Sequence, residues 1–294
     1  LGDRLIGDGH FSWLVRFGAR WLPWPRNDIG RLELTSITLA IPGLPLSWEG
    51  LNILMLSDLH FHGTPSRGLF EAIVQELRQR PRPDLLVIVG DLLDSDQHHS
   101  WIGELLGPLP AGQARLAILG NHDVSHQPEQ IRRELEAAGF TVLSNRWEPA
   151  TIRDLPVLFS GHEGPWLGRG PDLVDAPSFP FHLCLSHTPD NVYWAASQGI
   201  PLMLSGHVHG GQIRLPWIGS IFVPSIYGRR FDGGVYQIGP TVLVVSRGLS
   251  GKEPFRFRCL PEIIRITLTQ VDGSSRQGHG ESNDAESVPA SPED

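Results

Sequence analysis

The stretch LNILMLSDLHFHGTPSRGLFEAIVQELRQRPRPDLLVIVGDLLD, residues 51–94, decides the fold class of this 294-residue chain. Two short apolar runs within it, residues 51–58 and 84–91, have the composition of strands that are buried on both faces. Between them, residues 67–80 repeat apolar side chains with the spacing of an amphipathic helix. The alternation predicts an α/β core built around a largely buried sheet.

The same alternation continues along the chain. Further buried-strand runs are predicted at residues 114–121, 181–187 and 201–207, and a second amphipathic helix at residues 128–139 is stopped by Gly139. Weaker strand signals indicate extra strands, which either extend this sheet or form a second one. They lie at residues 32–41, 151–160, 241–246 and 262–269.

Charge is distributed unevenly over the sequence. The formal net charge is −8, and residues 271–294 hold six carboxylates against one arginine. Those residues almost lack apolar side chains and are predicted to form a disordered acidic tail. The remaining body is close to neutral and its arginines are scattered, so we expect no specific nucleic-acid partner.

The N-terminal region has an amphipathic pattern. Residues 11–24 place Trp13, Leu14, Phe17 and Trp21 on one arc of a helical wheel. This pattern predicts a helix that either docks on a membrane surface or packs against its own domain. No apolar run is long enough for a membrane-spanning helix, and the sequence starts at Leu1, so a preceding export signal or anchor would not be seen.

The sequence contains only two cysteines, Cys184 and Cys259. Two are too few for a disulfide framework or a cysteine zinc site, and two isolated core thiols are favoured over one disulfide. Any metal ion is therefore expected on His, Asp, Glu or Asn.

Polar side chains that can bind a metal ion follow each of the five buried-strand runs. In chain order they are Asp58 and His60, then Asp91 and Asp94, then Asn121, His122 and Asp123, then His187, and finally His207 and His209. Ligands of open α/β folds gather beyond the carboxyl ends of the strands. Asp58 and His60 are separated by one residue, and so are His207 and His209. In an extended strand, residues with this spacing point to the same side, so each pair is expected to supply two ligands.

In order, these residues read D-x-H, G-D-x-x-D, G-N-H-D, H and G-H-x-H over residues 58–209, which resembles the signature of the calcineurin-like metallophosphoesterases. The resemblance implies a four-layer αββα sandwich over residues 31–270, between an N-terminal amphipathic segment, residues 1–30, and the tail at 271–294. It also implies two divalent ions, which the ligand types suit as Mn, Fe or Zn. One ion would be held by Asp58, His60, Asp91 and His209, and the other by Asp91, Asn121, His187 and His207.

The resemblance further implies hydrolysis by a metal-bridging hydroxide. His122 would protonate the leaving oxygen or stabilise the pentacoordinate state, with Asp123 orienting its ring. Asp94 is interpreted as a supporting residue behind the ligands or as a cap. Two ions, two carboxylates and a hydroxide leave a charge near +1, which attracts an anionic phosphate ester.

The stretch at residues 206–236 resembles the bacterial YkuE-type branch of that family. That branch implies a phosphodiester or pyrophosphate substrate, lipid-linked or a nucleotide sugar such as UDP-2,3-diacylglucosamine. It also implies a peripheral location at the cytoplasmic or periplasmic face of a bacterial membrane. A general phosphodiesterase or phosphatase acting on nucleotides, nucleic acid or phosphoproteins is the alternative, and a catalytically silent scaffold is disfavoured because no element of the signature is missing.

Four further residues are candidates to contact the substrate. Arg229 and Arg230, with Tyr227 nearby, either hold a second phosphate or head group, or pair with local carboxylates such as Asp232. His162 ends another apolar run and is the fourth candidate to contact the substrate.

Overall fold

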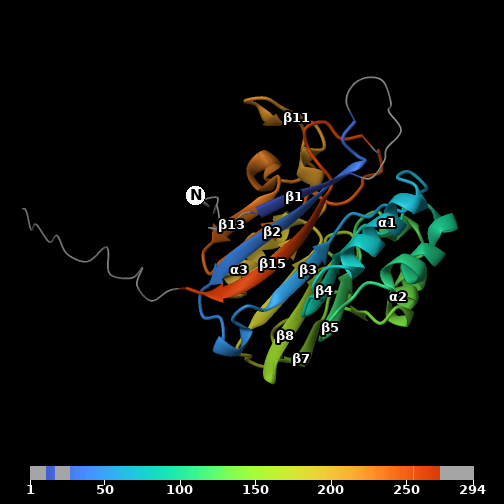
Figure 1. The fold of residues 1–294 in the computed structure, drawn as a ribbon. Helices are drawn as coiled ribbons and strands as arrows, with labels where there is room; N and C mark the ends of the chain where they lie inside the picture. Colours follow the sequence, from blue (N-terminus) through green and yellow to red (C-terminus); the bar gives the residue numbers. More distant parts are fainter. Residues whose placement is uncertain (1–10, 17–26, 254, 272–294) are drawn as a thin grey trace, which may run out of the picture.

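The computed structural model describes residues 11–16, 27–253 and 255–271, and within them two large sheets face each other (Figure 1). The seven-stranded sheet has the order β1-β2-β15-β3-β4-β5-β6, and the six-stranded sheet has the order β13-β14-β10-β9-β8-β7. The first comprises β1 (Phe11–Arg16), β2 (Arg31–Ile41), β3 (Asn52–Leu56), β4 (Leu85–Val89), β5 (Ala114–Ile118), β6 (Thr141–Val142) and β15 (Glu262–Gln270). The second comprises β7 (Trp147–Ile152), β8 (Leu155–His162), β9 (His182–Ser186), β10 (Leu202–Ser205), β13 (Gly234–Ile238) and β14 (Thr241–Val245).

Three α-helices and a small hairpin complete the described fold. The helices are α1 (Arg67–Arg78), α2 (Pro128–Ala137) and α3 (Val192–Ser197), and the hairpin pairs β11 (Arg214–Leu215) with β12 (Gly219–Ser220). Short helical turns lie in the loops at Leu46–Trp48, Asp96–His98, Ile102–Leu106, Asp123–Ser125, Pro189–Asn191, His209–Gly211 and Gly228–Phe231.

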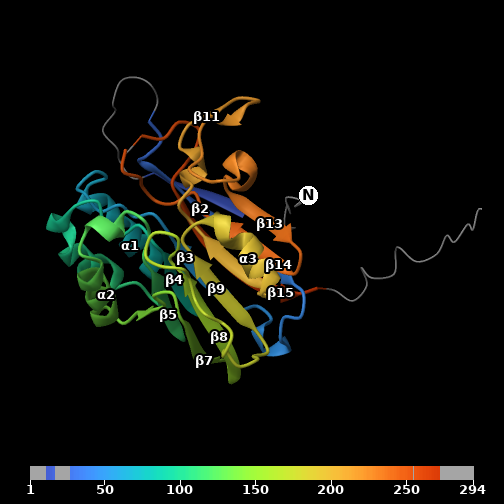
Figure 2. The same ribbon diagram turned by 180° about the vertical axis from the view of Figure 1, so that it is seen from behind.

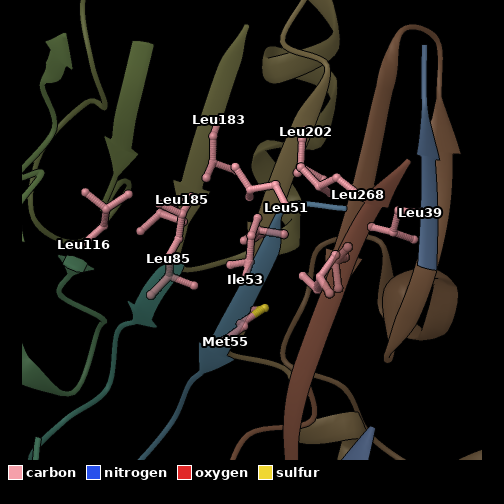
Figure 3. Close-up of a cluster of buried hydrophobic side chains, with 14 of the residues drawn as sticks. Leu39, Leu51, Ile53, Met55, Leu85, Leu116, Leu183, Leu185, Leu202 and Leu268 are labelled. Carbon is pink, nitrogen blue, oxygen red and sulfur yellow. The ribbon is translucent and has the colours of Figure 1, made fainter. Parts of the chain in front are cut away.

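The main core lies between the two sheets. Ile53, Leu85 and Leu116 of the first sheet meet Leu183 and Leu202 of the second in one buried cluster (Figure 3). Strand residues alternate between faces, and both faces of these strands are covered, which explains why the strands read as continuous apolar runs.

Helices cover the outer face of each sheet (Figures 1 and 2). Phe70, Ile73 and Leu77 of α1 follow helical spacing and pack on the outer side chains of the first sheet. On the other side, α3 packs against β14 through Val192 and Ala195. The layers are helix, sheet, sheet and helix, which confirms the predicted four-layer α/β sandwich.

The predicted elements agree with the structure except in two places. The single strand predicted at residues 151–160 is instead the end of β7 and most of β8, which are antiparallel. Arg153 and Asp154 take left-handed conformations and reverse the chain between the two strands. The helix predicted over residues 11–24 is wrong for residues 11–16, which form β1. The outer edge of β2 offers unpaired backbone groups, and β1 pairs with it in an antiparallel register from Phe11–Ser36 to Arg16–Arg31.

Two sequence expectations fall partly or wholly outside the described part of the chain. Residues 17–24 of the predicted helix and residues 272–294 of the predicted tail are not among the described residues. Cys184 and Cys259 are both buried and free, so the expectation of two core thiols is confirmed. Among the described helices, none has the length and apolar character needed to cross a bilayer.

Candidate metal centre

The expected ligands follow the carboxyl ends of β3, β4, β5, β9 and β10 and meet at one edge of the sandwich. Among the described residues, three groups of side chains bring their ligand atoms within 4.8 Å of one another; one is His60 with Asp94 and His122, and the other two contain expected ligands only. Of these two, the first group is Asp58, His60, Asp91 and His209, and the second is Asp91, His187 and His207. Asn121 joins the second group, since its Oδ1 lies 3.0 Å from His187 Nε2. The structure therefore brings all seven expected ligands together, with Asp91 in both groups.

The spacing of the ligand atoms suits bound cations. Asp91 Oδ2 lies 3.3 Å from His187 Nε2 and 3.6 Å from His60 Nε2, and His209 Nε2 lies 3.7 Å from Asp58 Oδ1. Ligands at about 2.0–2.2 Å from one ion are separated by roughly 3.0–3.6 Å. Asp91 Oδ2 and His60 Nε2 are buried and have no hydrogen-bond partner among the described residues. Such atoms are costly unless a cation accepts their lone pairs, so the residues fit a metal centre.

Each of three histidines is oriented by an acceptor on its far side. The Nδ1 atoms of His60, His187 and His209 lie 2.9 Å from Asp94 Oδ2, 2.9 Å from the Val89 carbonyl and 3.1 Å from the Ser250 carbonyl, respectively. An acceptor at Nδ1 keeps the proton there and leaves the Nε2 lone pair directed into the centre. In His207, burial and the neighbouring His187 lower the pKa to about 3, which keeps this imidazole neutral, as metal binding requires.

The backbone at the ligands is left-handed rather than extended. The non-glycine residues with positive φ include five of the seven expected ligands. These are Asp58 (54°), His60 (44°), Asp91 (51°), His207 (69°) and His209 (50°). Such conformations cost roughly 1–3 kcal/mol each and persist where the surrounding structure enforces them. The expectation of ligand pairs on extended strands is therefore wrong in its geometry, because the strands end before the ligands and the loops turn the side chains inward.

Gly206 allows the two sheets to approach each other at the centre. A Cβ atom at this position would lie 1.8 Å from Ser57 Oγ and 2.6 Å from Asp58 Oδ2. Next to it, the His207 N–H donates to Asp58 Oδ1 at 3.0 Å. The end of β10 is thereby fixed against the end of β3.

Asp94, not Asp123, orients the His122 ring. His122 Nδ1 lies 2.5 Å from Asp94 Oδ1, and the other oxygen of Asp94 contacts His60. Partial burial opposes ionisation of Asp94, but its hydrogen bonds with both histidines hold its pKa below the usual range. The His122 side chain is 26 % exposed, so its ring is open to solvent beside the ligands.

The ring-orienting role predicted for Asp123 is wrong because this side chain is fully engaged elsewhere. It is buried, and its carboxylate accepts the backbone N–H groups of Leu92, Leu93 and Gly120. Burial and nearby Asp91 raise its pKa to about 6. Asp123 thus holds the loops after β4 and β5 together.

The other candidate substrate contacts lie in well-defined environments. His162 is buried, its Nδ1 contacts Asn191 and Gly164, and burial lowers its pKa to about 4, as in a structural histidine. Arg229 donates to the carbonyls of Ile218 and Ser220.

The predicted alternative, pairing of these arginines with Asp232, is not formed. Asp232 pairs instead with Arg214 at 3.0 Å. The Arg230 guanidinium lies over the rings of Tyr193 and Phe231, and Tyr227 packs against the same two rings.

Two residues near the ligands were not among the candidate site residues, although the segment that contains the first of them, residues 162–168, suits either acyl chains or ordinary packing. Trp166, in the loop after β8, is 39 % exposed and its ring centroid lies 4.7 Å from that of His207. The run HEGPWLG after an apolar strand was the available signal. Arg256 is fully buried, and its guanidinium donates to the Ser250 carbonyl and contacts the His209 carbonyl. Nothing in its local sequence distinguishes it from a surface arginine.

The comparisons with known proteins agree with this geometry. The family model described as calcineurin-like phosphoesterase matches residues 51–211. The chain belongs to this family. As a calcineurin-like phosphoesterase it is a metal-dependent hydrolase of phosphoric esters, and enzymes of the family use two divalent metal ions.

Similar proteins include two bacterial relatives. This calcineurin-like phosphoesterase is 33 % identical to the uncharacterized metallophosphoesterase YkuE of Bacillus subtilis, over 82 % of this chain and 87 % of YkuE. It is 31 % identical to phosphodiesterase YaeI of Escherichia coli, over 74 % of this chain and 81 % of YaeI. Among solved structures, the 5′-nucleotidase precursor of Thermus thermophilus is similar with a TM-score of 0.45 and 14 % identity, over 75 % of this chain and 54 % of that one.

Proposed function

We propose that this protein is a phosphodiesterase in which Asp91 bridges two divalent ions. One ion would be held by Asp58, His60, Asp91 and His209, and the other by Asp91, Asn121, His187 and His207. The observation that carries the proposal is the buried Asp91 Oδ2, which has no hydrogen-bond partner among the described residues and lies between a histidine of each group. A carboxylate oxygen has enough lone pairs to serve two cations.

The reaction adds water across a P–O bond, with hydroxide going to phosphorus and a proton to the leaving oxygen. When bound, two divalent ions neutralise phosphate charge and lower the pKa of water from 15.7 toward about 7. The backbone N–H of His122 donates to Asp91 Oδ1 at 2.9 Å and so fixes the orientation of the Asp91 carboxylate.

We assign proton donation to the leaving oxygen to His122. The partly exposed ring of His122 lies beside the ligands, and its centroid is 4.7 Å from the centroid of the His60 ring. Burial opposes protonation of this ring, but the Asp94 hydrogen bond and the charges of Asp91 and Asp94 raise its pKa. A protonated imidazole held by a carboxylate is a suitable general acid near neutral pH.

A diester is favoured over a monoester by the relative named phosphodiesterase YaeI. Among phosphodiester and pyrophosphate substrates, a lipid-linked or nucleotide-sugar compound such as UDP-2,3-diacylglucosamine is favoured by one local feature. Trp166 places an exposed aromatic surface against His207, where it would contact an apolar or planar group next to the phosphate. A substrate of that kind is consistent with a peripheral location at a membrane.

The test is hydrolysis by enzyme reconstituted with Mn, Fe or Zn. Bis-p-nitrophenyl phosphate, p-nitrophenyl phosphate and UDP-2,3-diacylglucosamine are compared, and Asp91→Asn is the inactive control. We expect the diester to be cleaved faster than the monoester. Rapid monoester cleavage without diester cleavage would overturn the proposal, and UDP-2,3-diacylglucosamine cleavage no faster than that of the simple diester would leave a general phosphodiesterase.

A further inference from the structure

An apolar surface projects from the chain directly after the metal-binding loop of β10. We call residues 214–226, which comprise β11, β12 and the loop that follows, the apolar hairpin. It forms a separate two-stranded sheet that stands away from the two large sheets (Figure 1). Its exposed large apolar side chains are Trp217 (101 %), Ile226 (79 %), Phe222 (72 %), Ile218 (60 %), Ile221 (55 %) and Leu215 (36 %). Six such side chains within thirteen residues are a concentration of exposed apolar surface of the kind that marks an interaction site.

The base of the hairpin is firmly braced. Arg229 donates to the Ile218 carbonyl at 2.8 Å, spanning the hairpin from outside. Asp232 accepts from Ser220 Oγ at 2.8 Å and pairs with Arg214 at 3.0 Å. These contacts hold the backbone in place while the apolar side chains face solvent, so the exposure is a built feature of the fold.

The charge around the hairpin is net positive, because two carboxylates, Asp190 and Asp232, contact it against three arginines in or beside it. Residues 214–230 contain three arginines and no carboxylate. Arg229 and Arg230 are exposed, and neither forms an ion pair with any residue that the structure describes. Arg214, by contrast, is neutralised by Asp232.

We propose that the apolar hairpin docks on the surface of a phospholipid bilayer that contains anionic lipids. Trp217, Ile218 and Phe222 would enter the boundary between head groups and acyl chains, and Arg229 and Arg230 would contact lipid phosphates. Tryptophan prefers this boundary, and unpaired arginines at its edge are attracted to an anionic leaflet. The combination of a protruding apolar tip with a cationic base fits a bilayer better than the flatter, mixed surface of a protein partner.

Docking would also orient the metal centre. Gly211, two residues after the expected ligand His209, lies directly against the hairpin, since a Cβ there would be 2.5 Å from Ser220 Cβ and 2.7 Å from Phe222 O. The hairpin therefore borders the centre, so a docked molecule would present the centre to phosphates at the membrane surface. This consequence rests on the proposed function, whereas the docking itself does not.

The experiment is co-sedimentation of the full chain with vesicles of phosphatidylcholine, with or without phosphatidylglycerol. We expect the protein to bind the anionic vesicles, and Trp217→Ser/Phe222→Ser to reduce the partition coefficient at least about tenfold. The matched control is Leu46→Ser/Val174→Ser, which alters two equally exposed apolar residues outside the hairpin and should bind as wild type does. Arg230→Gln, which leaves the Arg229 contact with the Ile218 carbonyl intact, should weaken the preference for anionic vesicles.

Melting temperature establishes that each variant is folded, and metal content is a second check for the variants that alter only surface residues. Asp91→Asn separates the two proposals, because it should lose hydrolysis and retain vesicle binding. The docking proposal is overturned if wild type fails to bind either vesicle, or if the hairpin variant binds equally well, which would favour contact through residues 11–24. A wild-type dimer that becomes monomeric in the hairpin variant, without vesicle binding, would instead identify the hairpin as a self-association surface.

Discussion

Asp91 is the residue that belongs to both groups of expected ligands. Its Oδ1 accepts the His122 N–H, and its Oδ2 faces histidines of both groups. We expect Asp91→Asn to lower bound metal from two ions per chain to less than one, because the proposed bridging role gives this carboxylate to both ions. Elemental analysis of the purified protein measures the effect. Asn121→Ala is the control and should release only one ion; two tightly bound ions in Asp91→Asn would contradict the bridging assignment.

His122 provides the complementary prediction, because it lies beside the ligands without being one of them. His122→Ala should lower turnover of a diester by about 10²–10⁴-fold, the usual contribution of a general acid. Its metal content should remain close to that of wild type. Loss of both ions would show that the ring is needed to assemble the centre rather than to transfer a proton.

The gathering of the seven expected ligands was predictable at the residue scale, but the way the chain presents them was not. The order of Asp, His and Asn at strand ends predicted that these side chains would meet, and they do. Whether Asp94 or Asp123 contacts His122 depends on the path of two loops, which the family resemblance that suggested Asp123 does not determine. The role of Arg256 could not be predicted, because the burial of an arginine depends on segments that are distant in the sequence.

At the scale of elements, the loop after β10 is tightly constrained by Gly206. Its φ is not positive, so the effect of a side chain there is steric. Gly206→Ala should destabilise the fold by about 1–3 kcal/mol, as overpacking does, and should weaken metal binding because the added carbon meets Ser57 and Asp58. Chemical denaturation with and without metal measures both effects. Gly103→Ala is the matched control, since nothing lies within 4 Å of its added Cβ, and an equal effect of the two substitutions would refute the steric argument.

Element types were predicted well where one signal dominated. Buried strands and the two amphipathic helices carry strong periodic or apolar patterns, and the structure contains them within a few residues. The helix prediction was wrong at residues 11–16 because this segment pairs with the edge of β2. That pairing is a tertiary contact, which the local sequence pattern does not contain. Short elements such as α3 and β11 have too few residues to produce a period.

At the scale of the whole molecule, burial of neutral histidines makes stability depend on pH. His182 lies at the start of β9, and its Nε2 is 2.7 Å from Ser160 Oγ. Burial lowers its pKa from 6.5 to about 4. Above pH 6.5 the folded and unfolded chains are both neutral at this group. As the pH falls from 6.5 to about 4, the unfolded chain takes up a proton that the folded chain does not, so stability is lost.

We therefore expect His182→Gln to reduce the loss of stability between pH 6.5 and about 4. The free energy of unfolding is measured by urea titration across this range. Release of metal at low pH affects wild type and variant alike, so the difference between the two curves reports His182. Parallel curves would show that this histidine titrates normally in the folded protein.

The ligands come from both halves of the sandwich. Asp58, His60, Asp91 and Asn121 follow strands of one sheet, and His187, His207 and His209 follow strands of the other. A bound pair of ions is therefore a cross-link between the sheets, and it forms only when both are in place. Ions that bind the folded chain alone stabilise it by about 2.7 kcal/mol at one hundred times their dissociation constant. The cohesion of the two halves thus depends on the metal supply of the surroundings as well as on the packing between the sheets.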